Sequence, residues 1–341
     1  AIPYDAAIKT LDDNEPKLKN ALPQQIFTKT ALELGVLKSV VDEINKIDPK
    51  KFTDHDLIGR VYEYFLQAFS INADKEEGEF YTPHSIVELI ASLIEPFDGT
   101  VYDPCCGSGG MFVQATKFIE AHGGNTKAVN VYGQESEPAT YRLAKMNLAI
   151  RGISYHLGDK AVSTFSDDQH KDLKFDYIMA NPPFNVDKVK AESAQSAGRL
   201  PFGLPAINKA KEFGNANYLW ISYFYDYLNE NGRAGFVMAS TATDSQGKDK
   251  DIREKLVQTG HVDVMISVGN NFFYTKSLPC TLWFFDKGKA EALRDKVLFI
   301  DARNYYTVAD RTLNEWSEWQ LRNMNAIVWL YRGEQEAYQS L

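Results

Sequence analysis

Apolar runs of strand length alternate with helical patterns along most of this chain, and the alternation is its strongest constraint on the fold. Strands are expected at residues 100–103, 128–132, 155–157, 175–180, 234–239, 262–268, 281–285 and 297–300. Helices are expected between them at residues 111–121, 138–150, 218–228 and 251–258. Because a helix lets the chain return to start a parallel neighbour, this order predicts an α/β fold with a mostly parallel sheet and helices on both faces. The last strands follow short connections, which predicts an antiparallel edge.

The segments on either side of this pattern have helical character. Apolar side chains recur at helical spacing in residues 31–44 and again in residues 57–69, and a polar stretch at residues 74–78 marks a boundary. Helical spacing returns in residues 313–331, which are rich in tryptophan. We therefore expect a helical region at residues 1–78, a central domain at residues 79–311 and a helical tail at residues 312–341.

The composition excludes several functional classes. The 341 residues carry 37 basic and 46 acidic side chains, a net charge of −9, so the chain is poorly suited to coat nucleic acid without a partner that supplies a basic surface. The three cysteines and six histidines show no metal-binding spacing, so no metal is expected. We also expect no membrane span, no signal peptide and a cytoplasmic location.

The first expected strand ends in residues 103–110, which have the sequence DPCCGSGG. In an open α/β sheet, ligands lie outside the carboxyl ends of the strands. Glycines at this point let the backbone approach a ligand, and the following helix can receive an anionic group at its N-terminus. Alone, the pattern is equally consistent with a tight turn between a strand and a helix.

Acidic residues follow the next two strands. Glu135 ends the second strand, where a carboxylate can accept hydrogen bonds from a ribose diol. A lone glutamate would more often be a solvated side chain, but together with the glycine loop it favours a nucleoside site. Asp159 ends the third strand, where it could accept from an adenine amino group or cap the next segment; both interpretations stay open.

The tetrapeptide Asn181-Pro182-Pro183-Phe184 at the end of the fourth strand is the most specific signal. The prolines fix the backbone and remove two N–H donors, which leaves the Asn181 side-chain oxygen and the Pro182 carbonyl as acceptors. With the Phe184 ring beside them, they suit a planar group that carries an NH₂. A rigid turn with a core phenylalanine is the less favoured alternative.

At these residues the chain resembles the S-adenosylmethionine-dependent amino-methyltransferases, and most closely the modification subunits of type I restriction-modification systems, which are adenine-N6 DNA methyltransferases. The order of the motifs carries the resemblance, which covers nearly the whole chain: residues 79–84, 103–110, 133–135, 181–184, 270–274 and 297–301. The resemblance implies a Rossmann-like methyltransferase fold with a seven-stranded type of sheet, and a catalytic domain at residues 79–311.

The resemblance also implies roles for particular residues and for partners. Cofactor contacts would come from Glu79, Phe80, Tyr81, Thr82, Pro83, His84, Asp103, Gly107, Ser108, Gly109, Gly110, Glu135 and Asp159. Catalysis on a flipped adenine would involve Asn181, Pro182, Pro183 and Phe184. The implied partners are double-stranded DNA, a DNA specificity subunit, a restriction subunit with endonuclease and translocase activity, and a second copy of this chain in the complex.

Two other functions remain open from the sequence. Methyltransferases that act on a protein glutamine or on RNA share the Asn-Pro-Pro-aromatic motif, so the tetrapeptide does not exclude them. A scaffold subunit that binds a nucleoside without catalysis is the other alternative, and the intact residues 181–184 argue against it.

Overall fold

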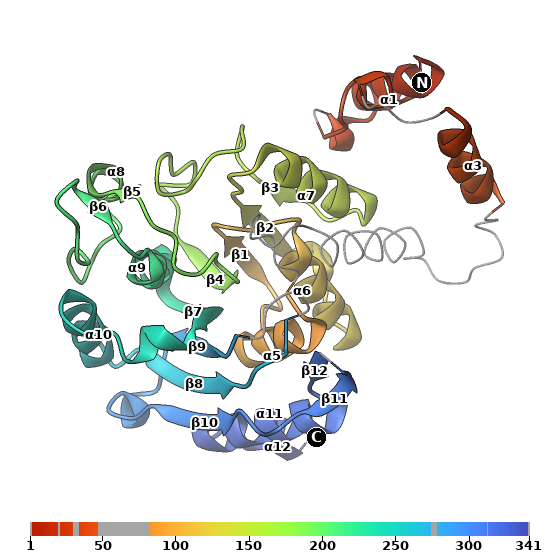
Figure 1. The fold of residues 1–341 in the computed structure, drawn as a ribbon. Coiled ribbons are helices and arrows are strands. Elements are labelled where there is room, and N and C mark those ends of the chain that lie inside the picture. The colour runs from red at the N-terminus through yellow and green to blue at the C-terminus, as the bar shows by residue number, and fades with distance from the viewer. Residues whose placement is uncertain are drawn as a thin grey trace.

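The computed structural model describes residues 2–19, 21–29, 34–46, 82–273, 278–311 and 313–339. Its centre is an eight-stranded sheet (Figure 1). In sheet order the strands are β3 (Tyr155–His156), β2 (Val129–Gly133), β1 (Gly99–Asp103), β4 (Phe175–Ala180), β7 (Leu228–Ala239), β9 (Cys280–Asp286), β8 (Val262–Val268) and β10 (Leu298–Ala302). The first three strands along the chain therefore form one half of the sheet, and the strands from β4 onward form the other half.

Neighbouring strands are parallel except where β9 pairs with β7 and β8, which confirms the mostly parallel α/β sheet. The predicted antiparallel edge is wrong, because the antiparallel strand β9 lies inside the sheet. It lies between β7 and β8, and β10 forms the edge, parallel to β8. The sequence of β9, CTLWFFD, explains this position, since it has no alternating polar side chains and every residue is buried.

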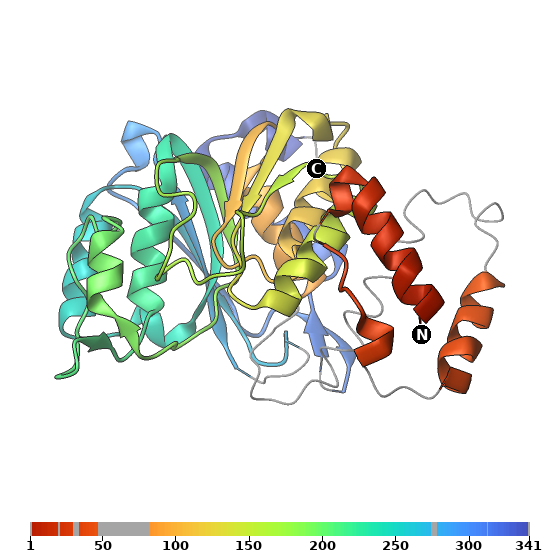
Figure 2. The ribbon, with the colours of Figure 1, turned by 90° about the horizontal axis from the view of Figure 1, so that it is seen from above.

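Helices cover both faces of the sheet (Figure 2). One face carries α5 (His84–Ile94), α6 (Gly110–Ala121), α7 (Pro138–Ile150) and α11 (Glu318–Arg332), whose buried side chains join one apolar cluster. The other face carries α8 (Ala191–Ser196), α9 (Asn217–Tyr227) and α10 (Lys248–Gln258), which contribute to a second cluster. The sheet therefore has an apolar core on each face, and the motifs at the C-terminal ends of its strands lie outside these cores.

The N-terminal segment is helical where the structure describes it. It contains α1 (Ile2–Asn14), α2 (Ile26–Lys29), α3 (Leu34–Asn45) and the 3-10 turn η1 (Pro16–Leu18). Turn η1 contacts α7, which links this segment to the sheet domain. The helix expected at residues 57–69 and the boundary at residues 74–78 lie outside the described residues.

The tail differs from the expected helix at its start. Residues 313–315 form strand β12 (Leu313–Glu315), which pairs with β11 (Thr307–Asp310). Helix α11 begins only after Ser317, whose side chain forms a capping box with Gln320. A serine followed three residues later by glutamine marks a helix start, and the sequence analysis missed this signal. Helix α11 packs on α5, and the division into three regions stays a prediction.

The remaining elements are short. A two-stranded antiparallel ribbon, β5 (Val189–Lys190) with β6 (Glu212–Phe213), lies in the long connection after β4. The other short elements are η3 (Thr126–Ala128), η4 (Ser240–Thr243), η5 (Glu291–Leu293) and α12 (Gln335–Gln339). Within the described ranges, no helix has both the length and the apolar character needed to cross a bilayer.

Candidate active site

The ends of β1, β2 and β4 meet at the carboxyl edge of the sheet. Asp103 pairs in register with Gly133, and β4 lies directly on the other side of β1. The backbone continues this contact beyond the strands, since Gln134 donates to the Asp103 carbonyl (3.0 Å) and Cys106 donates to the Gln134 carbonyl (2.9 Å). Three of the predicted motifs are thus neighbours.

The Glu135 carboxylate joins the end of β2 to the glycine loop. One oxygen accepts from the Gly107 amide (2.9 Å), and the other accepts from the Glu137 amide (2.8 Å) and the Ser136 hydroxyl (3.2 Å). The side chain remains partly exposed. A carboxylate fixed in this way is prearranged to accept further hydrogen bonds from a ligand above the loop.

The loop itself has the geometry of a close-approach site. Gly107 and Gly109 have φ values of 55° and 81°, in the left-handed region that favours glycine. Among the described residues, no atom beyond the adjacent backbone lies within 4 Å of an ideal Cβ built at Gly107 or Gly110, so side chains there would meet none of these residues. Asn147 of α7 supports the loop by donating to the Ser108 carbonyl (2.8 Å). The first amides of α6 follow at this edge.

Asp103 is a buried carboxyl at this edge whose pKa is shifted. It is only 1% exposed, and burial raises the pKa of its carboxyl to about 7. The Cys105 amide (3.0 Å) and thiol (3.4 Å) both donate to it and partly offset the burial. Burial also raises the pKa of the Cys105 and Cys106 thiols, which keeps them protonated and unsuited to act as nucleophiles.

The Asn181 side chain is held by a residue 99 positions earlier in the chain. Its Nδ2 donates to the Thr82 hydroxyl at 3.0 Å, while Asn181 itself is half-buried. The structure therefore brings together two motifs that the sequence analysis had assigned to different ligands. Next to Asn181, Pro182 is buried, Pro183 is exposed and the half-buried Phe184 packs against the first apolar cluster.

Three asparagines hold the turn after Phe184, and the sequence analysis missed them. Asn185 has a left-handed backbone (φ 57°), and its amide donates to Oδ1 of Asn217 at the start of α9 (2.9 Å). In return, Asn215 (2.9 Å) and Asn217 (3.0 Å) donate to Oδ1 of Asn185. Asparagine tolerates this backbone conformation and can bond locally, which was the available signal.

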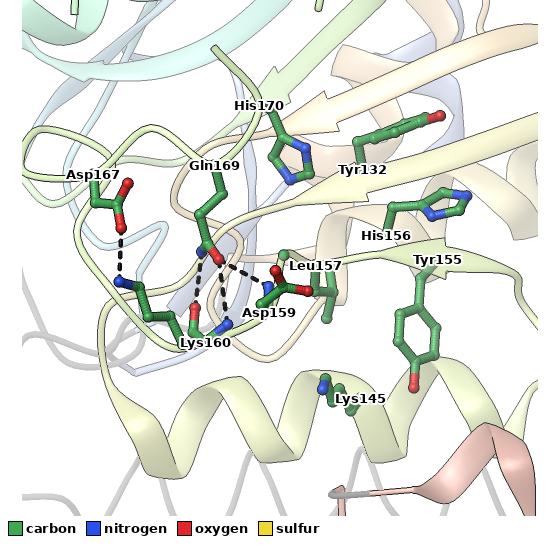
Figure 3. Close-up of a pocket in the computed structure, with 11 residues that line it drawn as sticks. Tyr132, Lys145, Tyr155, His156, Leu157, Asp159, Lys160, Asp167, Gln169 and His170 are labelled. Atoms are coloured by element: carbon green, nitrogen blue, oxygen red, sulfur yellow. Dashed lines mark hydrogen bonds and ion pairs between the residues drawn. The ribbon is translucent and has the colours of Figure 1, made fainter. Parts of the chain in front are cut away.

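Asp159 follows β3 in a loop that reaches the end of β2, where the Val162 amide donates to the Glu135 carbonyl (2.9 Å). The Asp159 carboxylate is exposed at the rim of a hollow beside β3, lined by Tyr132, His156 and His170 among others (Figure 3). Gln169 shapes this rim, because its side-chain oxygen accepts from the Asp159 amide (2.8 Å). Neither Glu135 nor Asn181 lines the hollow.

The remaining predicted residues are divided between the described and undescribed parts of the chain. Pro83 is buried, and His84 is exposed on α5, with its Nδ1 3.3 Å from Oε2 of Glu88. The predicted cofactor contacts Glu79, Phe80 and Tyr81 lie outside the described residues.

A family model described as N-6 DNA Methylase matches residues 53–340. The chain belongs to the N-6 DNA methylase family. It is 36% identical over 324 residues to the MjaIX methylase subunit of a type I restriction enzyme from Methanocaldococcus jannaschii, covering 94% of this chain and 57% of the relative. It is 39% identical over 271 residues to the HindI methylase subunit from Haemophilus influenzae, covering 79% of this chain and 59% of the relative. The chain thus spans less than two thirds of the length of either relative.

Solved structures confirm the methyltransferase fold of this chain. The methyltransferase subunit of a type I restriction-modification system from Streptococcus thermophilus superposes with a TM-score of 0.74 at 24% identity, covering 86% of this chain and 61% of that one. A class I S-adenosylmethionine-dependent methyltransferase from Listeria monocytogenes gives a TM-score of 0.63 at 15% identity, covering 87% and 90%.

Proposed function

We propose that this N-6 DNA methylase transfers a methyl group from S-adenosylmethionine to the exocyclic N6 of adenine in a specific DNA sequence. It would do so as the catalytic subunit of a type I restriction-modification complex. The observation that carries the proposal is the Asn181 amide, bonded to Thr82 at the same sheet edge as the glycine loop and Glu135. Two relatives named as type I restriction enzyme methylase subunits support the setting.

The residues at the ends of β1 and β2 fit S-adenosylmethionine. The space above Gly107 and Gly110 can receive the methionine end, for which the buried Asp103 carboxyl offers an acceptor to an ammonium group. Glu135 can accept from the ribose hydroxyls. When bound, the cofactor supplies an electrophilic methyl group on a sulfonium. Contacts from residues 79–84 and from Asp159 remain predictions.

Residues 181–184 would hold the flipped adenine. The amine of adenine is a weak nucleophile, because its lone pair is delocalised into the ring. Asn181 Oδ1 and the Pro182 carbonyl would each accept a hydrogen bond from one N–H of this amine. These bonds would favour a pyramidal nitrogen with a localised lone pair. The Phe184 ring would stack on the base. No strong base is needed, so these residues act by positioning and electrostatics, and the surplus proton leaves to solvent after transfer.

The partners and the location are part of the proposal. A specificity subunit would read the DNA sequence, a restriction subunit would supply cleavage and translocation, and two copies of this chain would act in the cytoplasmic complex. The net charge of −9 supports a division of labour in which another subunit supplies most of the DNA-binding surface. Family membership favours DNA over the RNA and protein-glutamine alternatives.

The chain alone is expected to methylate DNA poorly and to become active with a specificity subunit. An acidic protein gains little from phosphate contacts, so its DNA affinity must come from the partner. The test is purification of the complex from the native host, followed by labelled-methyl incorporation with and without the partner. Robust sequence-specific methylation by the chain alone would contradict this part of the proposal.

Cofactor binding is expected to weaken as the pH falls below 7. The pKa of the Asp103 carboxyl is about 7 in the free protein, and a bound ammonium group would lower it. Binding at low pH must therefore expel a proton, whereas above pH 7 the carboxylate is already ionised. Calorimetry should give about tenfold lower affinity at pH 6 than at pH 7.5, provided that the bound-state pKa lies well below 6. Asp103→Asn should bind more weakly with a flatter pH profile; an unchanged profile would remove Asp103 from the site.

A further inference from the structure

The Thr82 hydroxyl does not cap the helix that follows it. Helix α5 begins at His84, and its N-cap residue is Pro83, which makes no side-chain cap hydrogen bond. The amides of Ile86 (3.1 Å) and Val87 (3.2 Å) both donate to the Pro83 carbonyl. A threonine before a proline at a helix start is typical of a cap, but the Thr82 Oγ1 instead accepts from Asn181 Nδ2 at 3.0 Å.

Both partners of this hydrogen bond stand on rigid elements. Thr82 immediately precedes α5, which buries nine of its side chains and packs against α6, β7 and α11. Asn181 follows β4, whose last three residues are fully buried. Thr82 and Asn181 are themselves half-buried, so water competes less for the bond than at an open surface.

The bond determines which side of the Asn181 amide is available. An asparagine amide has two N–H donors on one side and an oxygen acceptor on the other. With its nitrogen side bonded to Thr82, the Oδ1 side is left for a ligand. An amine that is to be methylated carries N–H donors, so it needs that oxygen and is poorly matched by the nitrogen side.

We propose that Thr82 is a positioning residue for the reaction: it holds the Asn181 amide so that Oδ1 faces the amine that receives the methyl group. The inference rests on the proposed function, and it gives Thr82 a task different from the cofactor contact implied by family resemblance. A residue that acts only through Asn181 should affect turnover and not cofactor binding.

The test compares Thr82→Val with Thr82→Ser in the reconstituted complex. Valine matches threonine in shape but lacks the hydroxyl, so kcat should fall about tenfold while cofactor Kd changes less than twofold. Serine keeps the hydroxyl and should restore most of kcat. Thr116→Val is the matched control, because the hydrogen bond of the Thr116 hydroxyl in the described structure goes to the Phe112 carbonyl within α6 (2.9 Å), and it should leave kcat unchanged.

A double-mutant cycle separates action through Asn181 from an independent contribution. In an Asn181→Ala background, Thr82→Val should cause no further loss of kcat, since the amide it positions is gone. Full loss in both backgrounds, wild-type kcat in Thr82→Val, or a loss confined to cofactor affinity would each overturn the proposal.

A second readout does not depend on activity. In protein labelled with ¹⁵N-asparagine, the Asn181 side-chain NH₂ signal is assigned by its disappearance in Asn181→Ala. This signal should shift in Thr82→Val and stay near its wild-type position in Thr82→Ser. The same signal position in the wild type, Thr82→Val and Thr82→Ser would contradict the hydrogen bond. A wild-type complex without adenine methylation would disprove the proposed function, whereas this spectrum would still test the Thr82–Asn181 contact.

Discussion

Asn181→Ala is expected to reduce methyl transfer by about 10²–10³-fold while cofactor binding stays nearly intact, because loss of one preorganised hydrogen-bond partner at a reacting centre has an effect of this size. The alanine removes one of the two acceptors proposed to hold the target amine. The proposed cofactor groups lie on the loop after β1 and at Glu135, and neither bonds to Asn181 in the described structure. Labelled-methyl transfer in the reconstituted complex, with cofactor affinity measured in parallel, tests the separation.

Two further variants refine this test of the acceptor site. Asn181→Asp keeps an oxygen but places a charge beside a neutral base, so it should also be impaired. Phe184→Ala should weaken capture of the flipped base by about 1–3 kcal/mol, the usual value of a lost stack, and Phe184→Trp should be milder. Wild-type turnover in Asn181→Ala would remove the catalytic assignment and favour a nucleoside-binding scaffold.

Arg199→Met is expected to destabilise the fold by about 3–5 kcal/mol, because it leaves buried Asp168 without its cationic partner. Arg199 is 2% exposed, and its Nε and Nη1 donate to Asp168 (2.6 Å) and Asp226 (2.8 Å). Its Nη2 donates to the Lys171 carbonyl (2.6 Å), and the guanidinium lies 3.7 Å from the ring centroid of Tyr227. The residue thereby fastens the connection after β4 to the segment before β4 and to α9.

Urea unfolding with matched variants measures this effect. The exposed pair Arg303–Asp301 (2.7 Å) provides the control, and Arg303→Met should change stability by less than about 1 kcal/mol. Adding Asp168→Asn to Arg199→Met should recover part of the loss, since no charge is then left buried without its partner. Equal stability of the two single variants would show that the buried cluster contributes no more than a surface pair.

The mostly parallel α/β sheet followed from periodicity, and the placement of the motifs followed from where the strands end. Alternating elements with polar residues at each carboxyl end required Asp103, Glu135 and Asn181 to share an edge, and the registers of β1, β2 and β4 bear this out. The position of β9 was harder to predict, because short connections indicate an antiparallel strand but not the neighbours between which it lies.

Contacts between distant segments could not be predicted from local patterns. The Thr82–Asn181 bond joins residues 99 positions apart, and a threonine before a proline and a helix looks locally like a cap. The burial of Arg199 likewise depends on Asp168, in the loop before β4, and on Asp226, on α9. The roles of such residues can be recognised only in the folded structure, where their partners lie next to them.

The most direct test of the central claim is identification of the methylated product. The complex purified from its host would be incubated with labelled S-adenosylmethionine and DNA, RNA or protein, and the products digested and analysed by mass spectrometry. We expect N6-methyladenine in DNA at a defined sequence, and about 10²–10³-fold slower formation when the chain carries Asn181→Ala. Label in methylglutamine or in RNA with unmodified DNA, or N6-methyladenine formed at the wild-type rate by the variant, would contradict this expectation.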